Sequence, residues 1–145
     1  MSALPEDFWE TLPLHEGITL LTRDANGLAA FDKTAGVLSH PNGSEDEARA
    51  LLTCRYDKDA QCFIWKSVNG DERRLWLLNR LDSATSGVIL TAPSEKLAAA
   101  VRSHFANKQV RKIYNAIVFG KPQLKSDLWR DLLSVKKAQG QIRTS

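Results

Sequence analysis

The chain has 145 residues, of which 43% are hydrophobic and 26% charged, a composition typical of a single globular domain. No apolar run approaches the roughly 18 residues of a membrane span, and the acidic N-terminus predicts no secretory signal. Residues 1–50 hold three Lys or Arg against nine Asp or Glu, whereas residues 101–145 hold ten against two. This basic C-terminal third indicates either a site for a polyanion or a solvated tail.

Neither the cysteines nor the histidines are spaced as a metal site requires. Cys54 and Cys62 do not form a CxxC pair, and we interpret them as buried reduced thiols of a cytoplasmic protein. His15, His40 and His104 lie far apart, and the sequence has no glycine-rich loop for a nucleotide phosphate. We therefore expect neither a metal nor a cofactor, and no membrane partner.

The first part of the chain predicts an arm, a hairpin and an irregular crossing. Residues 1–16 contain two prolines and little periodicity, so we expect an arm that packs on the domain. Ile18–Thr22 and Leu28–Phe31 are predicted to pair as a β-hairpin, because the Asn-Gly between them readily adopts positive φ. Residues 33–41 are predicted to cross irregularly to the next element.

A helix is predicted from Ser44 to about Thr53, and a strand over Gln61–Ser67. Ser44 and Glu47 have the spacing of a capping box, and the acidic residues here suit the positive end of a helix. The side chains expected to face the core are Ala48, Leu51 and Leu52.

The stretch from Leu75 to Leu90 combines two apolar runs with a small polar turn. We predict a strand from Leu75 through Asp82 and another over Val88–Leu90. Side chains two apart in a strand share a face, so Arg80 and Asp82 would point the same way. Two interpretations of Asp82 stay open: an ionised carboxylate presented beside a cation, or an Asp that binds the amides of its own turn.

A second helix is predicted after residue 92. Ser94 is its expected cap and Asn107 its expected end. Its buried stripe is predicted to consist of Leu97, Ala98, Val101 and Phe105.

Arg111–Phe119 is predicted as a strand that carries an aromatic residue next to cations. Tyr114 follows Arg111 and Lys112, a pattern suited to stacking a nucleic-acid base while holding a phosphate. The alternative is a strand aromatic that packs on the sheet. Residues 121–145 fit either an extended irregular segment or a helix. The leucines on one face of such a helix would be Leu124, Leu128 and Leu132.

Strands, helix, strands, helix and strand thus follow one another with hairpin-like links. This order predicts an α+β fold with a mixed, mostly antiparallel sheet and helices packed on it. We interpret residues 1–145 as a single domain, with residues 1–16 as its N-terminal arm and residues 121–145 as a basic tail.

Three segments, in this order along the chain, resemble the RluA-type pseudouridine synthases. Arg80-Leu81-Asp82, followed by Thr85-Ser86-Gly87 and an apolar strand, resembles the catalytic motif of that family. Residues 31–41 resemble its early Lys-Pro-x-Gly and His-Pro segment, and residues 105–120 resemble a later segment with a Lys, a Tyr and a Gly. The resemblance covers about Leu20 to Gly120.

The resemblance implies the catalytic-domain fold of these synthases and the isomerisation of a uridine in RNA to pseudouridine without a cofactor. It implies that Asp82 is the catalytic nucleophile and that Arg80 enters the space vacated by the flipped base. It further implies that Tyr114 stacks on the uracil and that Lys112 and Arg111 hold phosphates. Ribosomal RNA is expected ahead of transfer RNA, on family frequency alone.

The chain departs from the family pattern at Asn79, where the family usually has His, and at Thr34, where it usually has Pro. The family's third catalytic segment is expected well beyond Gly120. Residues 141–143 resemble its end, but we interpret them as part of the preceding loop. The sequence therefore predicts the first part of a catalytic domain.

Three hypotheses follow. The first is an RNA pseudouridine synthase, and the second is a non-catalytic RNA-binding remnant of one. The third is an incomplete, inactive folding unit that associates with itself through an exposed sheet edge.

Overall fold

The computed structural model describes residues 4–121, 123–126, 128, 130, 135–138 and 141–144. The chain divides into two compact units, Met1–Arg111 and Lys112–Ser145. Among the described residues, the first unit contains a six-stranded sheet and the second a two-stranded one.

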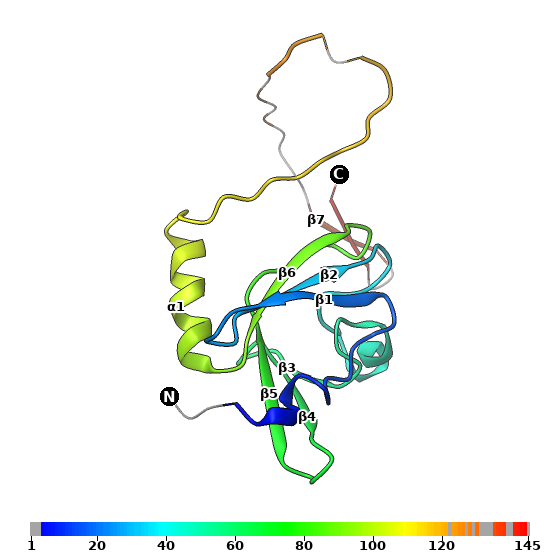
Figure 1. The fold of residues 1–145 in the computed structure, drawn as a ribbon. Coiled ribbons are helices and arrows are strands. Elements are labelled where there is room, and N and C mark those ends of the chain that lie inside the picture. Colours follow the sequence, from blue (N-terminus) through cyan, green and yellow to red (C-terminus); the bar gives the residue numbers. More distant parts are fainter. Residues whose placement is uncertain are drawn as a thin grey trace. The chain divides into compact units, whose positions relative to one another are not determined.

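The sheet of the first unit has the strand order β1-β2-β6-β5-β4-β3, and every neighbouring pair is antiparallel (Figure 1). An antiparallel sheet with a helix packed on it confirms the predicted α+β fold. The helical elements are η1 (Glu6–Phe8), η2 (Ser44–Arg49) and α1 (Glu95–Ala106). The strands are β1 (Ile18–Arg23), β2 (Ala29–Lys33), β3 (Arg55–Asp57), β4 (Cys62–Lys66), β5 (Glu72–Leu77) and β6 (Gly87–Ala92).

β1 and β2 form the predicted hairpin. Gly27 has a φ of +84°, in the left-handed region that glycine adopts without strain. The carboxylate of Asp24 accepts hydrogen bonds from the amides of Asn26 and Leu28, at 2.9 and 2.8 Å. The sequence of the turn therefore fixes how the two strands meet.

Different parts of the chain cover the two faces of the sheet. On one face, Phe8 of the N-terminal arm and residues 50–52 pack against the strands. The strand side chains buried there include Phe31, Phe63, Leu75 and Ile89. On the other face, α1 lies beside β6 and β5 (Figure 1). The predicted stripe of α1 packs there against Leu78 and Ala92.

The ends of α1 agree with the prediction. The Ser94 side chain accepts a hydrogen bond from the amide of Leu97, at 3.3 Å, and Asn107 is the C-cap. An N-cap hydroxyl satisfies one of the backbone donors that the first turn leaves free.

β4 confirms the strand predicted over Gln61–Ser67, but β3, which pairs with it, was missed. A strand of three residues is too short to show an alternating pattern. Cys62 is buried in β4, Cys54 is half-buried before β3, and both thiols are free, as predicted.

The α-helix predicted from Ser44 to Thr53 is wrong. The chain forms only η2, a 3-10 helix that ends at Arg49. Its N-cap is Gly43, without a side-chain hydrogen bond, so the predicted capping box does not form. Ala48, which was expected to face the core, is exposed.

Pairing with a distant segment ends this helix early. Leu38 N donates to Arg49 O and Leu51 N donates to Leu38 O, both at 2.8 Å. This strand-like pairing holds Ala50 in extended backbone and places Leu51 and Leu52 in the core. The long-range contact overrides the local helix propensity.

The strand predicted from Leu75 through Asp82 is also wrong, because β5 ends at Leu77. Beyond it, the side chain of Asn79 bonds to the backbone of β6 in place of a further backbone ladder. Arg80 and Asp82 therefore lie in irregular backbone, where strand alternation does not set their directions.

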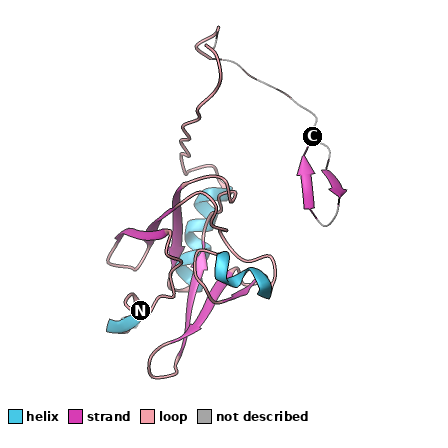
Figure 2. Ribbon diagram, turned by 90° about the vertical axis from the view of Figure 1, so that its right-hand side faces the viewer, coloured by secondary structure: helices cyan, strands magenta, loops and turns pink. Residues whose placement is uncertain are grey.

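In the second unit, the strand predicted over Arg111–Phe119 is wrong, since residues 112–121 form neither helix nor strand (Figure 2). A strand needs a neighbour that takes up its backbone hydrogen bonds. The apolar side chains of this segment are exposed instead of packed, with 71% of Ile113, 103% of Ile117 and 108% of Phe119 accessible.

The remainder of the second unit contains a hairpin of β7 (Val135–Ala138) and β8 (Gln141–Thr144). Residues 141–143 lie in β8, so their interpretation as part of a loop is wrong. The described residues between 123 and 130 form no helix, which favours the irregular alternative there. Leu132, the last leucine of the alternative helix, lies outside the described residues.

Candidate active site

Asp82 lies in the turn between β5 and β6. The amide of Thr85 donates to the backbone carbonyl of Asp82, at 3.0 Å, so this turn is closed through the main chain. By contrast, the carboxylate of Asp57 accepts the amides of Asp59 and Ala60, both at 3.0 Å, as that of Asp24 does in its own turn. These hydrogen bonds lower the pKa of Asp57. Asp82 itself is exposed to solvent.

Lys33 lies beneath this turn and is completely buried, at the end of β2. Its ammonium donates to the carbonyls of Val37 at 2.7 Å, Thr34 at 3.0 Å and Ser83 at 3.2 Å. Burial lowers the pKa of Lys33, and the nearby carboxylate of Asp82 opposes that shift. Lys33 thus ties residues 34–37 to the turn of Asp82 and places a positive charge near it.

Sequence reasoning did not single out Lys33. A signal was present, because Ala29, Phe31 and Lys33 alternate along β2 and all three are buried. A lysine in register with two core positions must find acceptors inside the protein.

Two further contacts hold the same turn against residues 36–39. Ser39 Oγ donates to Leu81 O at 2.6 Å and accepts from Leu81 N at 2.9 Å. Gly36 N donates to Ser83 O at 2.6 Å. The residues on both sides of Asp82 are therefore fixed by a segment more than 40 positions away in the sequence.

Asn79 holds the other end of this stretch. Its Nδ2 donates to Val88 O at 3.1 Å, and its Oδ1 accepts from Leu90 N at 2.7 Å. The asparagine that departs from the family pattern thus replaces a pair of backbone hydrogen bonds to β6.

Arg80 is exposed, and its Nη1 lies 3.3 Å from His40 Nε2. His40 in turn stacks on Tyr56. The ion pairs among the described residues do not join Arg80 to Asp82. The structure therefore brings Arg80 and Asp82 into one stretch and adds His40 and Lys33, which sequence reasoning missed as site residues.

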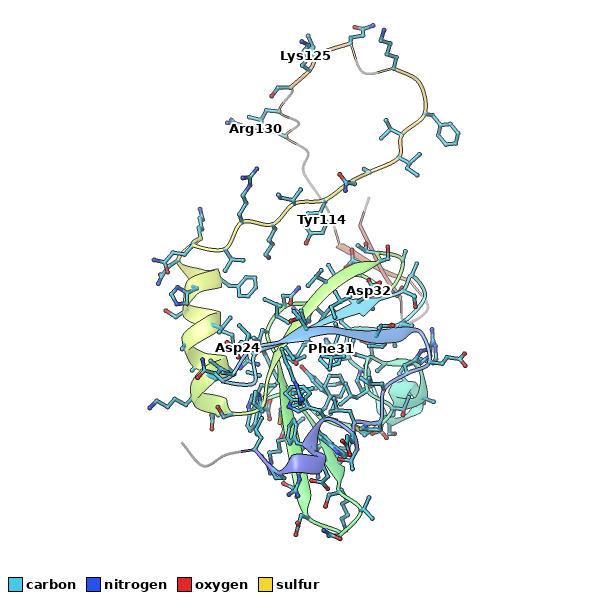
Figure 3. All side chains as sticks on the ribbon, viewed as in Figure 1. Asp24, Phe31, Asp32, Tyr114, Lys125 and Arg130 are labelled. Atoms are coloured by element: carbon cyan, nitrogen blue, oxygen red, sulfur yellow. The ribbon has the colours of Figure 1, made fainter. Side chains whose placement is uncertain are left out.

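The remaining predicted site residues lie at or beyond the boundary between the units. Arg111 is the last residue of the first unit and is exposed. Lys112 and Tyr114 belong to the second unit, in which Tyr114 is 62% exposed (Figure 3). The roles of these three residues in the reaction stay predictions.

The part of the chain that the structure describes contains no group of three or more His, Cys, Asp or Glu side chains arranged to hold a metal ion. Nor does any helix among the described residues have the length and apolar character needed to cross a membrane.

Comparison with known proteins gives one family. Residues 27–145 match the family model described as RNA pseudouridylate synthase. An uncharacterized RNA pseudouridine synthase of Chlorobaculum parvum is 36% identical over 120 residues, which cover 81% of this chain and 35% of that protein. No solved structure shows a significant match.

Relatives named for two kinds of RNA are also similar. The tRNA pseudouridine synthase C of Vibrio cholerae is 35% identical over 64% of this chain and 34% of its own length. The ribosomal large subunit pseudouridine synthase D of Borreliella burgdorferi is 28% identical over 74% of this chain and 32% of its own length. The chain thus spans about a third of the length of the curated relatives it matches.

Proposed function

This chain belongs to the RNA pseudouridylate synthase family, and from that membership we propose that it isomerises a uridine in RNA with Asp82 as the nucleophile. In this reaction the bond between uracil N1 and ribose C1′ breaks and a bond between C5 and C1′ forms. The proton lost from C5 is balanced by a proton taken up at N1. Asp82 attacks either C1′ or the uracil ring and leaves again when the new bond is complete.

The contrast between the aspartates carries this proposal. Asp24 and Asp57 bind amides of their own turns with their carboxylates, whereas in the described part of the chain the carboxylate of Asp82 accepts no amide of its turn. The flanking residues of Asp82 are held by Lys33 and Ser39. A carboxylate on a fixed backbone, exposed to a substrate and near a buried cation, has the properties that a nucleophile requires.

Arg80 and the cations near the unit boundary are proposed to bind the RNA. Arg80 would fill the space that the flipped base leaves, because its guanidinium can stack on the neighbouring bases and contact phosphates. Lys112 and Arg111 would hold phosphates, and Tyr114 would stack on the uracil.

Release of tritium from C5 of uridine tests the proposal, because C5 loses its hydrogen only when the new C5–C1′ bond forms. We expect release from RNA with this chain. Asp82→Asn should reduce the rate more than roughly 10³-fold, since the amide is not a nucleophile. The matched control is Asp32→Asn, which changes an exposed aspartate on β2 and should leave the rate unchanged.

Release that survives in Asp82→Asn would contradict the assignment of the nucleophile. RNA binding without any release would instead support the alternative, a non-catalytic RNA-binding protein. The same assay with separate ribosomal and transfer RNA decides between the two substrates for which relatives are named. We propose ribosomal RNA as the preferred one, in the reducing compartment that the two free thiols suit.

Self-association through a sheet edge is a separate proposal. β1 and β3 are the outer strands of the six-stranded sheet, and an outer strand presents unpaired backbone groups to another chain. A sedimentation profile that stays monomeric at high protein concentration would contradict it.

A further inference from the structure

The side chain of His40 contacts both Arg80 and the ring of Tyr56. Its Nε2 is 3.3 Å from Arg80 Nη1, and its Nδ1 is 3.0 Å from the carbonyl oxygen of Pro41. Its ring lies parallel to that of Tyr56, with the ring centroids 4.9 Å apart and an angle of 10° between the planes. Both ring nitrogens and one face of the imidazole therefore have a defined neighbour.

The hydrogen-bonding chemistry of these neighbours determines which ring nitrogen of His40 carries the hydrogen. A guanidinium group can only donate hydrogen bonds, so Nε2 must accept from Arg80. A carbonyl oxygen can only accept, so Nδ1 must carry the hydrogen and donate to Pro41. The two contacts together are satisfied by one form of the side chain, the neutral imidazole with its hydrogen on Nδ1.

Stacking on Tyr56 sets the plane of the His40 ring, and so the direction in which Nε2 accepts. Its ring packs against Phe63, with centroids 4.9 Å apart, and Phe63 is completely buried in the sheet. Burial raises the pKa of Tyr56 to about 12, so the ring that stacks on His40 stays uncharged at neutral pH. The charged side chains that act electrostatically on Tyr56 are Arg102, Arg80 and Asp57.

We propose that His40 is a positioning residue that holds the Arg80 guanidinium for entry into the RNA. This inference rests on the proposed function, in which Arg80 takes the place of the flipped base. A carboxylate partner would neutralise the arginine, whereas a neutral imidazole orients it and leaves its charge available to RNA phosphates. Arg80 is exposed, and a long exposed side chain without such an acceptor samples many rotamers.

Two substitutions of His40 separate the effect of its hydrogen-bond acceptor from the effect of its aromatic ring. His40→Phe keeps an aromatic ring against Tyr56 but removes the acceptor. His40→Gln removes the ring but places a carbonyl oxygen close to the position of Nε2. Matching thermal unfolding temperatures of the two variants and the unmodified chain would establish that all of them are folded.

The first measurement uses the chain without RNA. Long-range ¹H–¹⁵N correlation spectra should show the hydrogen of His40 on Nδ1, and ¹⁵N relaxation should show an ordered Arg80 Nε. The order of Arg80 should fall in His40→Phe and be largely kept in His40→Gln. A hydrogen on Nε2, or equal order of Arg80 in His40→Phe and the unmodified chain, would overturn the inference.

The second measurement uses an RNA hairpin with one loop uridine and 2-aminopurine beside it, whose fluorescence rises when the uridine leaves the stack. We expect His40→Phe to weaken binding about 5–10-fold, the loss of one charge-assisted hydrogen bond, and His40→Gln to stay within about 2-fold. Equal affinities of all three proteins would overturn the inference. If the unmodified chain does not bind the hairpin, the proposed function fails, while the relaxation of Arg80 still decides the role of His40.

Discussion

The turn that carries Asp82 and the segment that carries Tyr114 are held in different ways. Around Asp82, Lys33 is completely buried and Ser39 is 6% exposed, and both bond to the backbone of the turn. Around Tyr114, the apolar side chains of Ile117 and Phe119 are as exposed as in an extended chain. The first region belongs to the packed sheet and the second to a separate unit.

This difference shows what positions the backbone around Asp82. The Asp82 turn has one backbone hydrogen bond of its own, and it is held in addition by a segment that begins at Lys33, about 50 residues earlier. The Tyr114 segment has a strong strand pattern of its own, yet it forms no strand in the described residues. Long-range contacts therefore decide between order and exposure here, and local propensity does not.

The largest contrast is expected for the same substitution in the two units. Phe31 is completely buried in β2 (Figure 3), whereas Phe119 is 108% exposed. Phe31→Ala should lower the free energy of unfolding by about 3–5 kcal/mol, from lost apolar burial and the cavity left behind, and Phe119→Ala by less than about 0.5 kcal/mol. Urea unfolding of both variants measures these changes in the free energy of unfolding. Comparable losses would mean that Phe119 is packed, and the contrast between the units would be wrong.

The second contrast replaces a buried and an exposed lysine. Lys33→Met fills a similar volume but removes the donor to the carbonyl of Val37 and one of the two donors to that of Ser83. We expect a loss of about 2–4 kcal/mol, because buried acceptors without a partner are costly. Lys121→Met, an exposed position of the second unit, should change stability by less than about 0.5 kcal/mol. If Lys33→Met left the free energy of unfolding unchanged, the gain from no longer burying a charge would offset the lost hydrogen bonds.

Most of the fold of the first unit could be predicted because its signals are local. The β1–β2 turn contains its own Asn-Gly, and α1 has a Ser cap and a regular apolar stripe. The family resemblance predicts a role for Asp82 from its neighbours in sequence. In each case, the residues that determine the feature lie within a few positions of one another.

The predictions failed where a distant residue replaces a local pattern. Leu38 pairs with residues 49–51 and stops the helix after η2. The Asn79 amide takes the place of the backbone ladder that would have extended β5. The support that Lys33 gives to the Asp82 turn spans 50 residues, and no periodicity in the sequence reports such a contact.

The third contrast concerns two serines. Ser39→Ala removes both a donor and an acceptor from the backbone of Leu81, next to Asp82. We expect a loss of about 1–3 kcal/mol, together with slower tritium release, because the turn is less firmly placed. Ser126→Ala in the second unit, at an exposed position, should alter stability by less than about 0.5 kcal/mol. Circular dichroism during urea unfolding gives both values. Equal effects would contradict the role of Ser39 in holding the turn.

The smallest effect is a pH dependence that arises from a half-buried thiol of the packed unit. Burial raises the pKa of Cys54 from 9.0 to about 12. Between these values the unfolded chain releases the thiol proton and the folded chain retains it, so the free energy of unfolding falls as pH rises. The slope from this one group is at most about 1.4 kcal/mol per pH unit.

Cys54→Ala removes this contribution, so the stability of the variant should fall less steeply than that of the unmodified chain between pH 9 and pH 10.5. Lys33, whose pKa burial lowers, acts in the opposite direction, because the unfolded state then binds the additional proton. Lys33 is present in both proteins, so its effect cancels when the two slopes are subtracted. Identical slopes would mean that Cys54 is solvated in the folded chain, and the packing before β3 would then resemble that of the exposed second unit.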